Sequence, residues 1–162
     1  MELRGSQVVL RPLAEGDVSA LLAIVAQPAV AAWWGKQPAG FPLTDEPTAT
    51  RFTILEDSEV AGMIQYSEEL DPDYRHAWID LFVDETRHGR GLGSDAVRAL
   101  ADFLVSERGH HRVTIDPAAD NHAAIRAYEK AGFRPVGVMR AAWRDTWTGA
   151  WRDTLFMERV AL

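Results

Sequence analysis

Residues 77–104 read AWIDLFVDETRHGRGLGSDAVRALADFL, and residues 121–133 read NHAAIRAYEKAGF. The first segment predicts an apolar strand that leads through a glycine-rich turn into a helix with one apolar stripe. Glycines at such a turn bring backbone N–H groups and a helix N-terminus to one point, which suits a phosphate. The second segment predicts a helix whose tyrosine could protonate a leaving group. Together they indicate a phosphate-bearing cofactor and an acid catalyst.

The glycine spacing separates this turn from two better-known phosphate-binding loops. Gly89, Gly91 and Gly93 form G-x-G-x-G, which is neither the dinucleotide-binding G-x-G-x-x-G nor a P-loop ending in Lys-Ser/Thr. A Rossmann unit would also require an acidic residue about 20 residues further on, after a following strand. Three glycines in a turn are, by themselves, equally compatible with a purely structural role.

The second helix places two functional groups on one face. Asn121 and Tyr128 are seven residues apart, which is close to two helical turns. Gly132 follows the helix as a C-terminal cap would. The alternative interpretation of Tyr128 is a core aromatic residue whose hydroxyl is satisfied internally.

Taken together, R-H-G-R-G-L-G at 87–93 and N-x-x-A-x-x-x-Y-x-K-x-G-F at 121–133 resemble the motifs of the GCN5-related N-acetyltransferases. The resemblance extends to VVLRPLAEGDVSALLAIV, which is similar to that family's first strand and helix, and to DTLFMERV, which is similar to its last strand. One position departs from the family, because His88 stands where Arg or Gln is usual and Arg87 lies beside it. The resemblance implies a single domain over residues 1–162, with a mixed, mostly antiparallel central sheet and helices on both faces (α/β class).

The resemblance also implies acetyl-CoA as the acetyl donor. Its pyrophosphate would meet the backbone N–H groups of the glycine turn, at the start of the helix expected over residues 91–105. Its pantetheine amides would follow the exposed edge of residues 81–83, as an added strand does. The N–H near Val83 could hold the developing oxyanion. The cofactor-binding residues expected on this basis are Leu81, Phe82, Val83, Arg87, His88, Gly89, Arg90, Gly91, Leu92, Gly93, Ser94 and Asn121.

A closer resemblance, to the aminoglycoside 6'-N-acetyltransferases, rests on AWWGK, WIDLF, TIDPAADN and the tyrosine helix. It implies that Trp34 packs against a bound sugar or shapes its pocket. Asp80 and Asp116 would hold substrate ammonium groups, Tyr128 would be the general acid, and Asp80 would also serve catalysis. Asp153, near the start of the last strand, is a further expected substrate contact.

The residues alone leave alternatives open for the two carboxylates. Asp80 interrupts an apolar strand, where an aspartate is unfavourable, but it could lie on the polar face of a two-residue alternation. Asp116 precedes Pro117, where an aspartate that stabilises a turn is as common as a functional one.

Three functions remain in play at this level. The first is acetylation of the 6'-amine of an aminoglycoside, by direct attack of the amine. The second is the same chemistry on another amine, such as a protein N-terminus, a polyamine or a small metabolite. The third is a module that binds acetyl-CoA without turnover, which an intact Tyr128 disfavours.

Bulk properties exclude several other classes. The 162 residues contain no cysteine, which excludes disulfides, thiolate metal sites and an acetyl-cysteine intermediate. A formal charge of −7 disfavours nucleic acid as a partner and favours a cationic one. The apolar runs are too short to span a bilayer, and the N-terminus lacks an apolar signal region, so we expect a cytoplasmic protein. We expect a monomer or homodimer, no bound metal, and all five histidines at the surface.

The remaining pattern fixes the expected elements. Residues 28–48 are rich in Pro and Gly and contain Trp33 and Trp34, and no element is predicted there. Trp143, Trp147 and Trp151 fall in a segment with loop character, and could wall a sugar-stacking surface or a dimer interface. Strands are expected over residues 8–10, 51–56, 60–69, 75–83, 112–116, 133–140 and 152–160, and helices over residues 17–26, 91–105 and 121–130.

Overall fold

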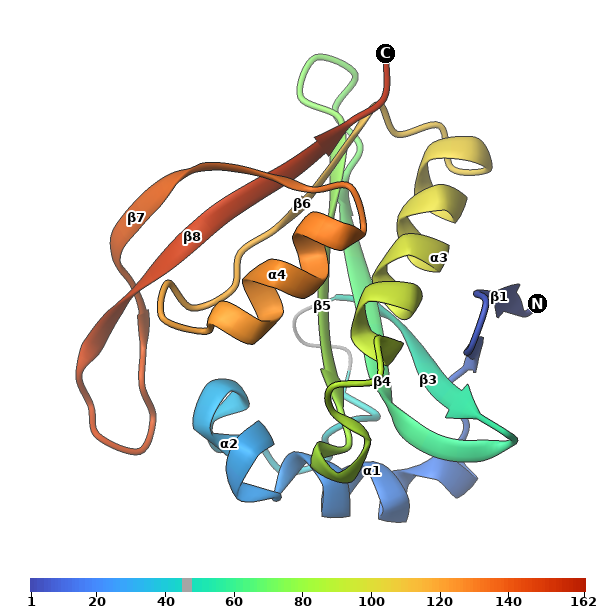
Figure 1. Cartoon of the computed structure of the whole chain (residues 1–162), viewed down its shortest axis with the longest axis vertical. Helices are drawn as coiled ribbons and strands as arrows, with labels where there is room; N and C mark the ends of the chain where they lie inside the picture. Colours follow the sequence, from blue (N-terminus) through green and yellow to red (C-terminus); the bar gives the residue numbers. More distant parts are fainter. Residues whose placement is uncertain (45–47) are drawn as a thin grey trace.

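The strands of the chain form one sheet in the order β1-β2-β3-β4-β5-β6-β8-β7 (Figure 1). The computed structural model describes residues 1–44 and 48–162. Among the strands it describes, only β5 and β6 pair in parallel; the other neighbours are antiparallel. The strands are β1 (Leu3–Arg4), β2 (Val9–Pro12), β3 (Thr50–Glu56), β4 (Glu59–Glu69), β5 (His76–Val83), β6 (Arg112–Ile115), β7 (Arg134–Arg144) and β8 (Trp151–Val160).

Helices cover both faces of this sheet, as expected. Helices α3 (Leu92–Ser106) and α4 (His122–Lys130) lie side by side over one face and share a large apolar core with the strands (Figure 1). Helices α1 (Val18–Val25) and α2 (Pro28–Trp34) pack on the other face, in a smaller core that includes Met63 and Phe82. Single turns of 3-10 helix occupy Glu15–Asp17 and Glu85–Arg87.

The parallel pair β5–β6 opens the sheet where the site lies. The two strands pair only at Ala77 with Val113 and at Trp78 with Thr114. Beyond these pairs β5 continues to Val83, still paired with β4 on its other side, while β6 ends at Ile115. One edge of residues 79–83 is therefore left without a neighbouring strand.

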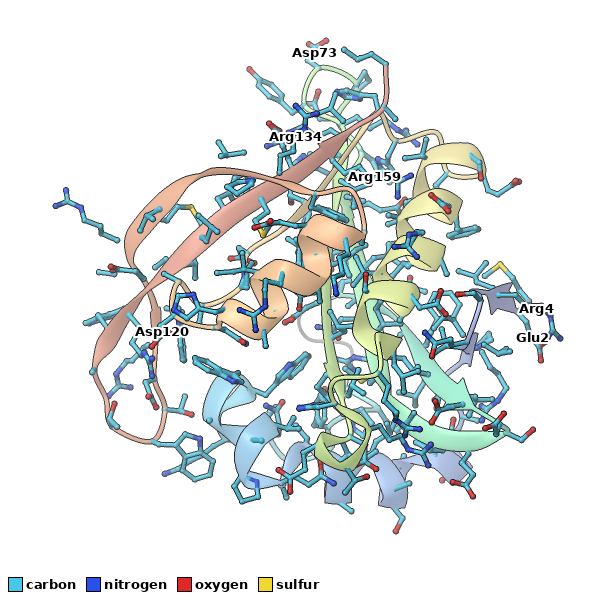
Figure 2. All side chains as sticks on the ribbon, viewed as in Figure 1. Glu2, Arg4, Asp73, Asp120, Arg134 and Arg159 are labelled. Carbon is cyan, nitrogen blue, oxygen red and sulfur yellow. The ribbon has the colours of Figure 1, made fainter. Side chains whose placement is uncertain are left out.

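The N-terminal end of α3 is held in place by the buried carboxylate of Asp95. Its two oxygens accept hydrogen bonds from the backbone N–H groups of Ser6, Gln7 and Val8, at 2.8–3.0 Å, and from the Ser6 hydroxyl. These contacts join the start of α3 to the segment between β1 and β2. At the other end of the sheet, Arg159 of β8 pairs with Asp102 of α3 at 2.6 Å (Figure 2).

The hairpin β7–β8 extends from the body of the protein and returns to contact α2 (Figure 1). At its tip, Trp147 Nε1 donates to the carbonyl of Ala31 at 2.8 Å. Beside it, the N–H of Lys36 donates to Thr146 Oγ1 at 2.9 Å. The hairpin thus closes one end of the region between α2 and the opened edge of β5.

Most of the expected elements lie within one or two residues of their observed bounds. The segment at 28–34 was expected to hold no element, yet it forms α2, because Pro28 stands at the first helical position, where proline is favoured. Strand β7 runs to Arg144 rather than ending at residue 140, since it stays paired with β8 across two irregularities. Part of the Pro- and Gly-rich segment, residues 45–47, lies outside the described residues.

The expectation that all histidines lie at the surface is wrong for His110. This side chain is only 1% exposed, and its Nε2 lies 2.7 Å from Glu68 Oε1. Glu68 also accepts hydrogen bonds from Arg108, so its carboxylate is paired with both side chains. No single helix among the described residues is long and apolar enough to cross a membrane, although α1 with its preceding turn and α2, bent by 95°, reach that length together.

Candidate active site

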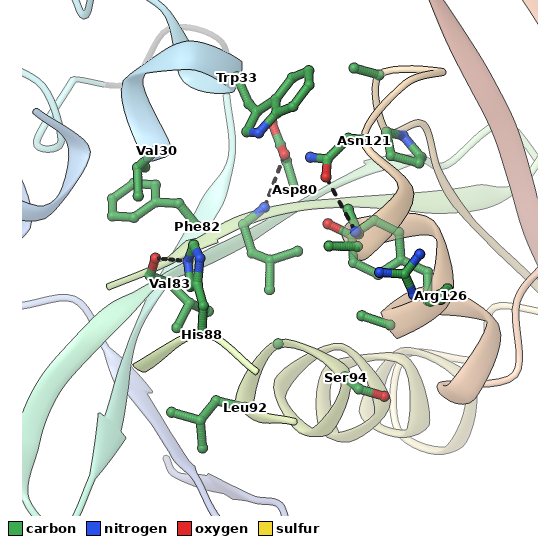
Figure 3. Close-up of a pocket in the computed structure, with 18 of the residues that line it drawn as sticks. Val30, Trp33, Asp80, Phe82, Val83, His88, Leu92, Ser94, Asn121 and Arg126 are labelled. Carbon is green, nitrogen blue, oxygen red and sulfur yellow. Dashed lines mark hydrogen bonds between the residues drawn. The ribbon is translucent and has the colours of Figure 1, made fainter. Parts of the chain in front are cut away.

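A cavity of about 690 Å³ lies at the opened edge of β5 (Figure 3). It is bordered by α2, by the glycine turn and first turn of α3, by one face of α4, by the segment after β6 and by the hairpin β7–β8. Most of the predicted site residues line this cavity. These are Trp34, Asp80, Leu81, Phe82, Val83, Arg87, His88, Gly89, Gly91, Leu92, Gly93, Ser94, Asp116, Asn121 and Tyr128.

Two predicted site residues do not line the cavity. The guanidinium of Arg90 is bound to Glu56 at 3.0 Å. Asp153 accepts a hydrogen bond from the N–H of Ala141, a residue with a left-handed φ of +51°, so its carboxylate stabilises a distortion of β7. Thr154, the next residue on β8, lines the cavity instead, because side chains alternate along a strand.

One end of the cavity is formed by the glycine turn and the N-terminus of α3. Gly89 and Gly91 have φ values of +79° and +80°, a left-handed conformation that glycine adopts without strain. The helix begins directly afterwards at Leu92, so its first N–H groups have no carbonyl partner within the helix. Ser94, in the first turn, has a buried hydroxyl without a hydrogen-bond partner among the described residues. Unpaired donors at a helix N-terminus fit an anionic phosphate group.

The cationic side chains of this turn are engaged with carboxylates. Arg87 donates to Glu56 at 2.6 Å and to Glu59 at 2.7 Å. These contacts raise the pKa of Arg87, chiefly through the hydrogen bond to Glu59. The predicted role of Arg87 as a phosphate ligand therefore rests on its backbone and not on its side chain.

Two carbonyl groups on the open edge of β5 are hydrogen-bonded by side chains. Trp34 Nε1 donates to the carbonyl of Leu81 at 2.9 Å. His88 Nε2 contacts the carbonyl of Val83 at 2.8 Å (Figure 3). Because strand groups alternate in direction, the N–H of Val83 points to the same edge as its carbonyl. This edge thus presents an N–H donor beside two carbonyls that already accept hydrogen bonds.

Two carboxyl groups form the acidic end of the cavity. Asp80 is accessible from the cavity but has protein on most sides, and burial raises its pKa to about 7, with a further contribution from the charge of Asp116. A hydrogen bond from the N–H of Leu81 to Asp80 Oδ1, at 3.0 Å, opposes this increase. Burial raises the pKa of Asp116 as well. Two neighbouring carboxylates that resist ionisation fit a cationic ligand, which would relieve their repulsion.

Tyr128 lines the same cavity from α4. It is buried, and its hydroxyl has no hydrogen-bond partner in the described part of the chain. Burial, and then the charges of Asp80 and Asp116, raise the pKa of this phenol well above its ordinary value. The hydroxyl therefore keeps its proton at neutral pH. Asn121 precedes α4 and caps it, because its Oδ1 accepts from the N–H of Ala124 at 3.3 Å.

Of the adjacent tryptophans, Trp34 is the one fixed in the fold. Its ring packs edge-on against Phe82 at a centroid distance of 4.9 Å, and its indole nitrogen is committed to Leu81. Trp33 also lines the cavity (Figure 3). The guanidinium of Arg152 lies over the Trp33 ring at 5.6 Å and over the Trp143 ring at 5.3 Å.

The further residues that line the cavity include five aromatic, cationic or hydroxyl side chains outside the predicted set of site residues. They are Trp33, Arg126, Lys130, Trp143 and Thr154. Two of them carried a usable signal, because Arg126 and Lys130 are four residues apart on the helix of Tyr128 and so share a face. Trp143 is one of the three tryptophans that the sequence offered as the wall of a sugar-stacking surface or a dimer interface. Thr154 carried no signal, since its position depends on the pairing of β7 with β8. Within residues 1–44 and 48–162, no cluster of three or more His, Asp or Glu side chains could hold a metal ion.

This combination of fold and site defines an N-acetyltransferase. The model of the acetyltransferase (GNAT) family matches residues 21–133, and the chain belongs to that family.

Its relatives include enzymes that modify aminoglycosides. The chain is 30% identical over 155 residues to aminoglycoside N(6')-acetyltransferase type 1 of Klebsiella pneumoniae, covering 82% of this chain and 76% of that protein. The structure of AAC(6')-Ib in complex with paromomycin and acetyl-CoA is similar with a TM-score of 0.78 and 25% identity, over 96% of this chain and 94% of that one. The ribosomal-protein-S5-alanine acetyltransferase of Vibrio fischeri shares the fold, with a TM-score of 0.83, 16% identity and coverage of 99% and 96%.

Proposed function

We propose that this protein transfers the acetyl group of acetyl-CoA to the 6'-amine of an aminoglycoside. The observation that carries the proposal is the cavity, which joins an anion-binding helix N-terminus to a pair of carboxyl groups with raised pKa values. An anionic cofactor and a polycationic substrate could thus meet in one cavity. The similarity to aminoglycoside acetyltransferases supports the choice of substrate.

The cofactor would be held mainly by backbone groups. The N–H groups of the Gly89–Gly93 turn, together with the unpaired hydroxyl of Ser94, fit its pyrophosphate. The cationic side chains of Arg126 and Lys130 line the cavity as well and would attract its phosphates. When bound, acetyl-CoA supplies an activated acetyl group and a thiol leaving group.

The substrate amine would be prepared by Asp80. An amine attacks only when neutral, and it is a cation at neutral pH, so a base must accept its proton. A carboxyl group with a pKa of about 7 is suited to this task at neutral pH. Asp116 would hold a second ammonium group of the substrate.

Tyr128 and the edge of β5 would stabilise the reacting groups. The Tyr128 hydroxyl is protonated and unpaired, so it can donate to the sulfur as the thiol leaves. While the carboxylates of Asp80 and Asp116 are unpaired, the high pKa of Tyr128 favours donation of a hydrogen bond over full transfer of its proton. A bound ammonium group would neutralise these carboxylates and so lower the pKa of Tyr128. The N–H of Val83 would stabilise negative charge on the acetyl oxygen.

The proposal is tested by measuring CoA release with kanamycin, spermine and an N-terminal alanine peptide as acceptors. We expect kcat/KM for kanamycin to exceed the other two values, and mass spectrometry to place one acetyl group on the 6'-nitrogen. Equal or higher kcat/KM with spermine or the peptide would overturn the choice of substrate. We also expect the protein to be cytoplasmic, where acetyl-CoA is present.

A further inference from the structure

The hairpin β7–β8 contributes two side chains to the cavity that have no role in the scheme above. Trp143 of β7 and Thr154 of β8 both line the cavity that also contains Asp116. Trp143 Nε1 and Thr154 Oγ1 are buried, and neither has a hydrogen-bond partner among the residues described. Thr154 is 4% exposed. Native proteins leave few buried polar atoms unpaired, and two such atoms on residues that line one cavity indicate a place for a ligand.

Both residues are held firmly. The Trp143 ring lies against the guanidinium of Arg152, which is bound to Asp120 at 2.5 Å and Asp145 at 3.3 Å. Thr154 pairs with Ala118, in the segment that follows Asp116. The wall is therefore built by tertiary contacts on both sides, and its polar atoms are not free to find partners elsewhere.

The chemistry of these atoms restricts the ligand. An indole N–H can only donate a hydrogen bond, whereas a threonine hydroxyl donates and accepts. Asp80 and Asp116 accept hydrogen bonds and carry negative charge when ionised. The complete ligand must therefore present ammonium groups to the carboxylates and an acceptor atom to Trp143. An ammonium group is only a donor, so a polyamine would leave the Trp143 N–H unpaired.

We propose that Trp143 and Thr154 form a subsite for a hydroxyl or ether oxygen of the substrate, and thereby select an amino sugar over a plain polyamine. This rests on the proposed function and names the feature of the substrate that the enzyme reads besides its charge. The amine-bearing sugar ring has such oxygens within a few bonds of its nitrogen.

The test compares two small amines that share an aminomethyl group on a six-membered ring. Methyl 6-amino-6-deoxyglucoside carries ring and hydroxyl oxygens, and cyclohexylmethylamine has none. We expect the wild-type kcat/KM to favour the glucoside by about tenfold or more, the effect of one or two hydrogen bonds. Trp143→Phe and Thr154→Val should each reduce this ratio about two- to tenfold, while kcat/KM for cyclohexylmethylamine stays unchanged.

Two further variants separate this role from packing. Thr154→Ser retains the hydroxyl and should restore the ratio. Trp151→Phe makes the same exchange as Trp143→Phe at an exposed position of β8 that does not line the cavity, and should leave the ratio at its wild-type value. A ratio unchanged by both Trp143→Phe and Thr154→Val would overturn the subsite.

Thermal unfolding provides a readout that does not depend on turnover. Because the Thr154 hydroxyl has no partner among residues 1–44 and 48–162, Thr154→Val should not lower the melting temperature of the free protein, but kanamycin should raise it less than in the wild type. A large loss of stability in the free variant would show that the hydroxyl has a structural partner, and would overturn the proposal.

The remaining outcomes distinguish this inference from the proposed function. Acetylation of kanamycin that is insensitive to both variants would leave the proposed function standing and refute the subsite. A peptide N-terminus that is preferred over the glucoside, with the same dependence on Trp143 and Thr154, would refute the amino sugar as the ligand. No acetylation of kanamycin by the wild type would refute the proposed function itself.

Discussion

At the scale of single residues, the site depends on carboxyl and phenol groups whose pKa values are shifted by their surroundings. The pKa values of Asp80 and Tyr128 are both raised, mainly by burial, and both residues line the cavity. One group can accept a proton near neutral pH and the other keeps its own. Environments that assign opposite roles to two titrating groups are typical of acid–base catalysis.

The role of Tyr128 is tested by Tyr128→Phe. This change keeps the ring and its packing and removes only the hydroxyl, which has no hydrogen-bond partner to lose within the described part of the chain. We expect kcat to fall by a factor of about 10²–10⁴, while the dissociation constants of acetyl-CoA and kanamycin stay unchanged. Single-turnover kinetics should be used, so that chemistry and not product release is measured. An unchanged rate would return Tyr128 to the role of a core aromatic.

The pKa of Asp80 predicts the pH profile. Asp80 accepts a proton only when ionised, so kcat/KM should rise with pH through about 7, where the free enzyme loses this proton. The corresponding rise of kcat with pH should lie at lower pH, because a bound ammonium group stabilises the ionised carboxylate of Asp80. Asp80→Asn should lower kcat by about 10² or more and abolish this rise.

A stability measurement controls this variant. A raised pKa in the folded state means that ionising Asp80 opposes folding, an effect that is absent at low pH and grows as pH rises toward about 7. Asp80→Asn should therefore be at least as stable as the wild type at pH 8. A marked loss of stability there would indicate that Asp80 has a structural role.

At the scale of elements, the phosphate site proposed at the glycine turn requires that α3 start at a fixed place. Glycines alone would leave the turn mobile, but Asp95 ties the first turn of α3 to residues 6–8. Burial opposes ionisation of Asp95, yet its hydrogen bonds to Gln7, Ser6 and Val8 outweigh it and lower its pKa.

The contribution of Asp95 is tested by Asp95→Asn. Losing charge-assisted hydrogen bonds should cost about 2–3 kcal/mol in the free energy of unfolding at pH 7, measured with urea. A lowered pKa stabilises the fold above the ordinary aspartate pKa, and this is lost as pH falls through the lowered value, so wild type and variant should converge in acid. Asp102→Asn, an exposed ion-pair partner on the same helix, should cost less than about 1 kcal/mol. Equal losses would contradict the assignment.

At the scale of the whole molecule, the cavity is lined by both carboxylates and cationic side chains, a separation of charge that the net charge of the chain does not reveal. The chain carries a net charge of −7, yet Arg126 and Lys130 line the cavity without an ion-pair partner among residues 1–44 and 48–162. The carboxylates lie on β5 and after β6, whereas these cations lie on α4. Such a distribution would orient an anionic cofactor against a cationic acceptor.

This distribution is tested with Arg126→Gln and Lys130→Gln combined. We expect KM for acetyl-CoA to rise about tenfold or more at low salt, because phosphate contacts to cations are charge-assisted. The effect should shrink as salt is added. Acetyl-pantetheine, which lacks the phosphates, should react equally with both proteins, and Arg140→Gln on exposed β7 should change neither value. A KM that shifts equally for both donors would point to a distorted helix instead.

The sequence by itself determined most of the local elements and the glycine turn that borders the cavity. Glycine spacing, the apolar strand and the apolar stripe of α3 are local patterns, so they predicted the turn, and the resemblance they carry predicted the family, which the comparison confirms. The helix of Asn121 and Tyr128 was predictable for the same reason. The individual roles assigned to site residues remain predictions.

Tertiary structure alone decided which groups are left free at the site. Arg87 appeared available in the sequence, but the fold brings Glu56 and Glu59 against it. His110 was expected at the surface, but Glu68 of a distant strand pairs with it. Trp143 and Thr154 enter the cavity only because β7 pairs with β8 and resumes that pairing after the irregularity between Met139 and Trp143. These facts join residues far apart in the chain, and local periodicity holds no information about which distant side chains meet.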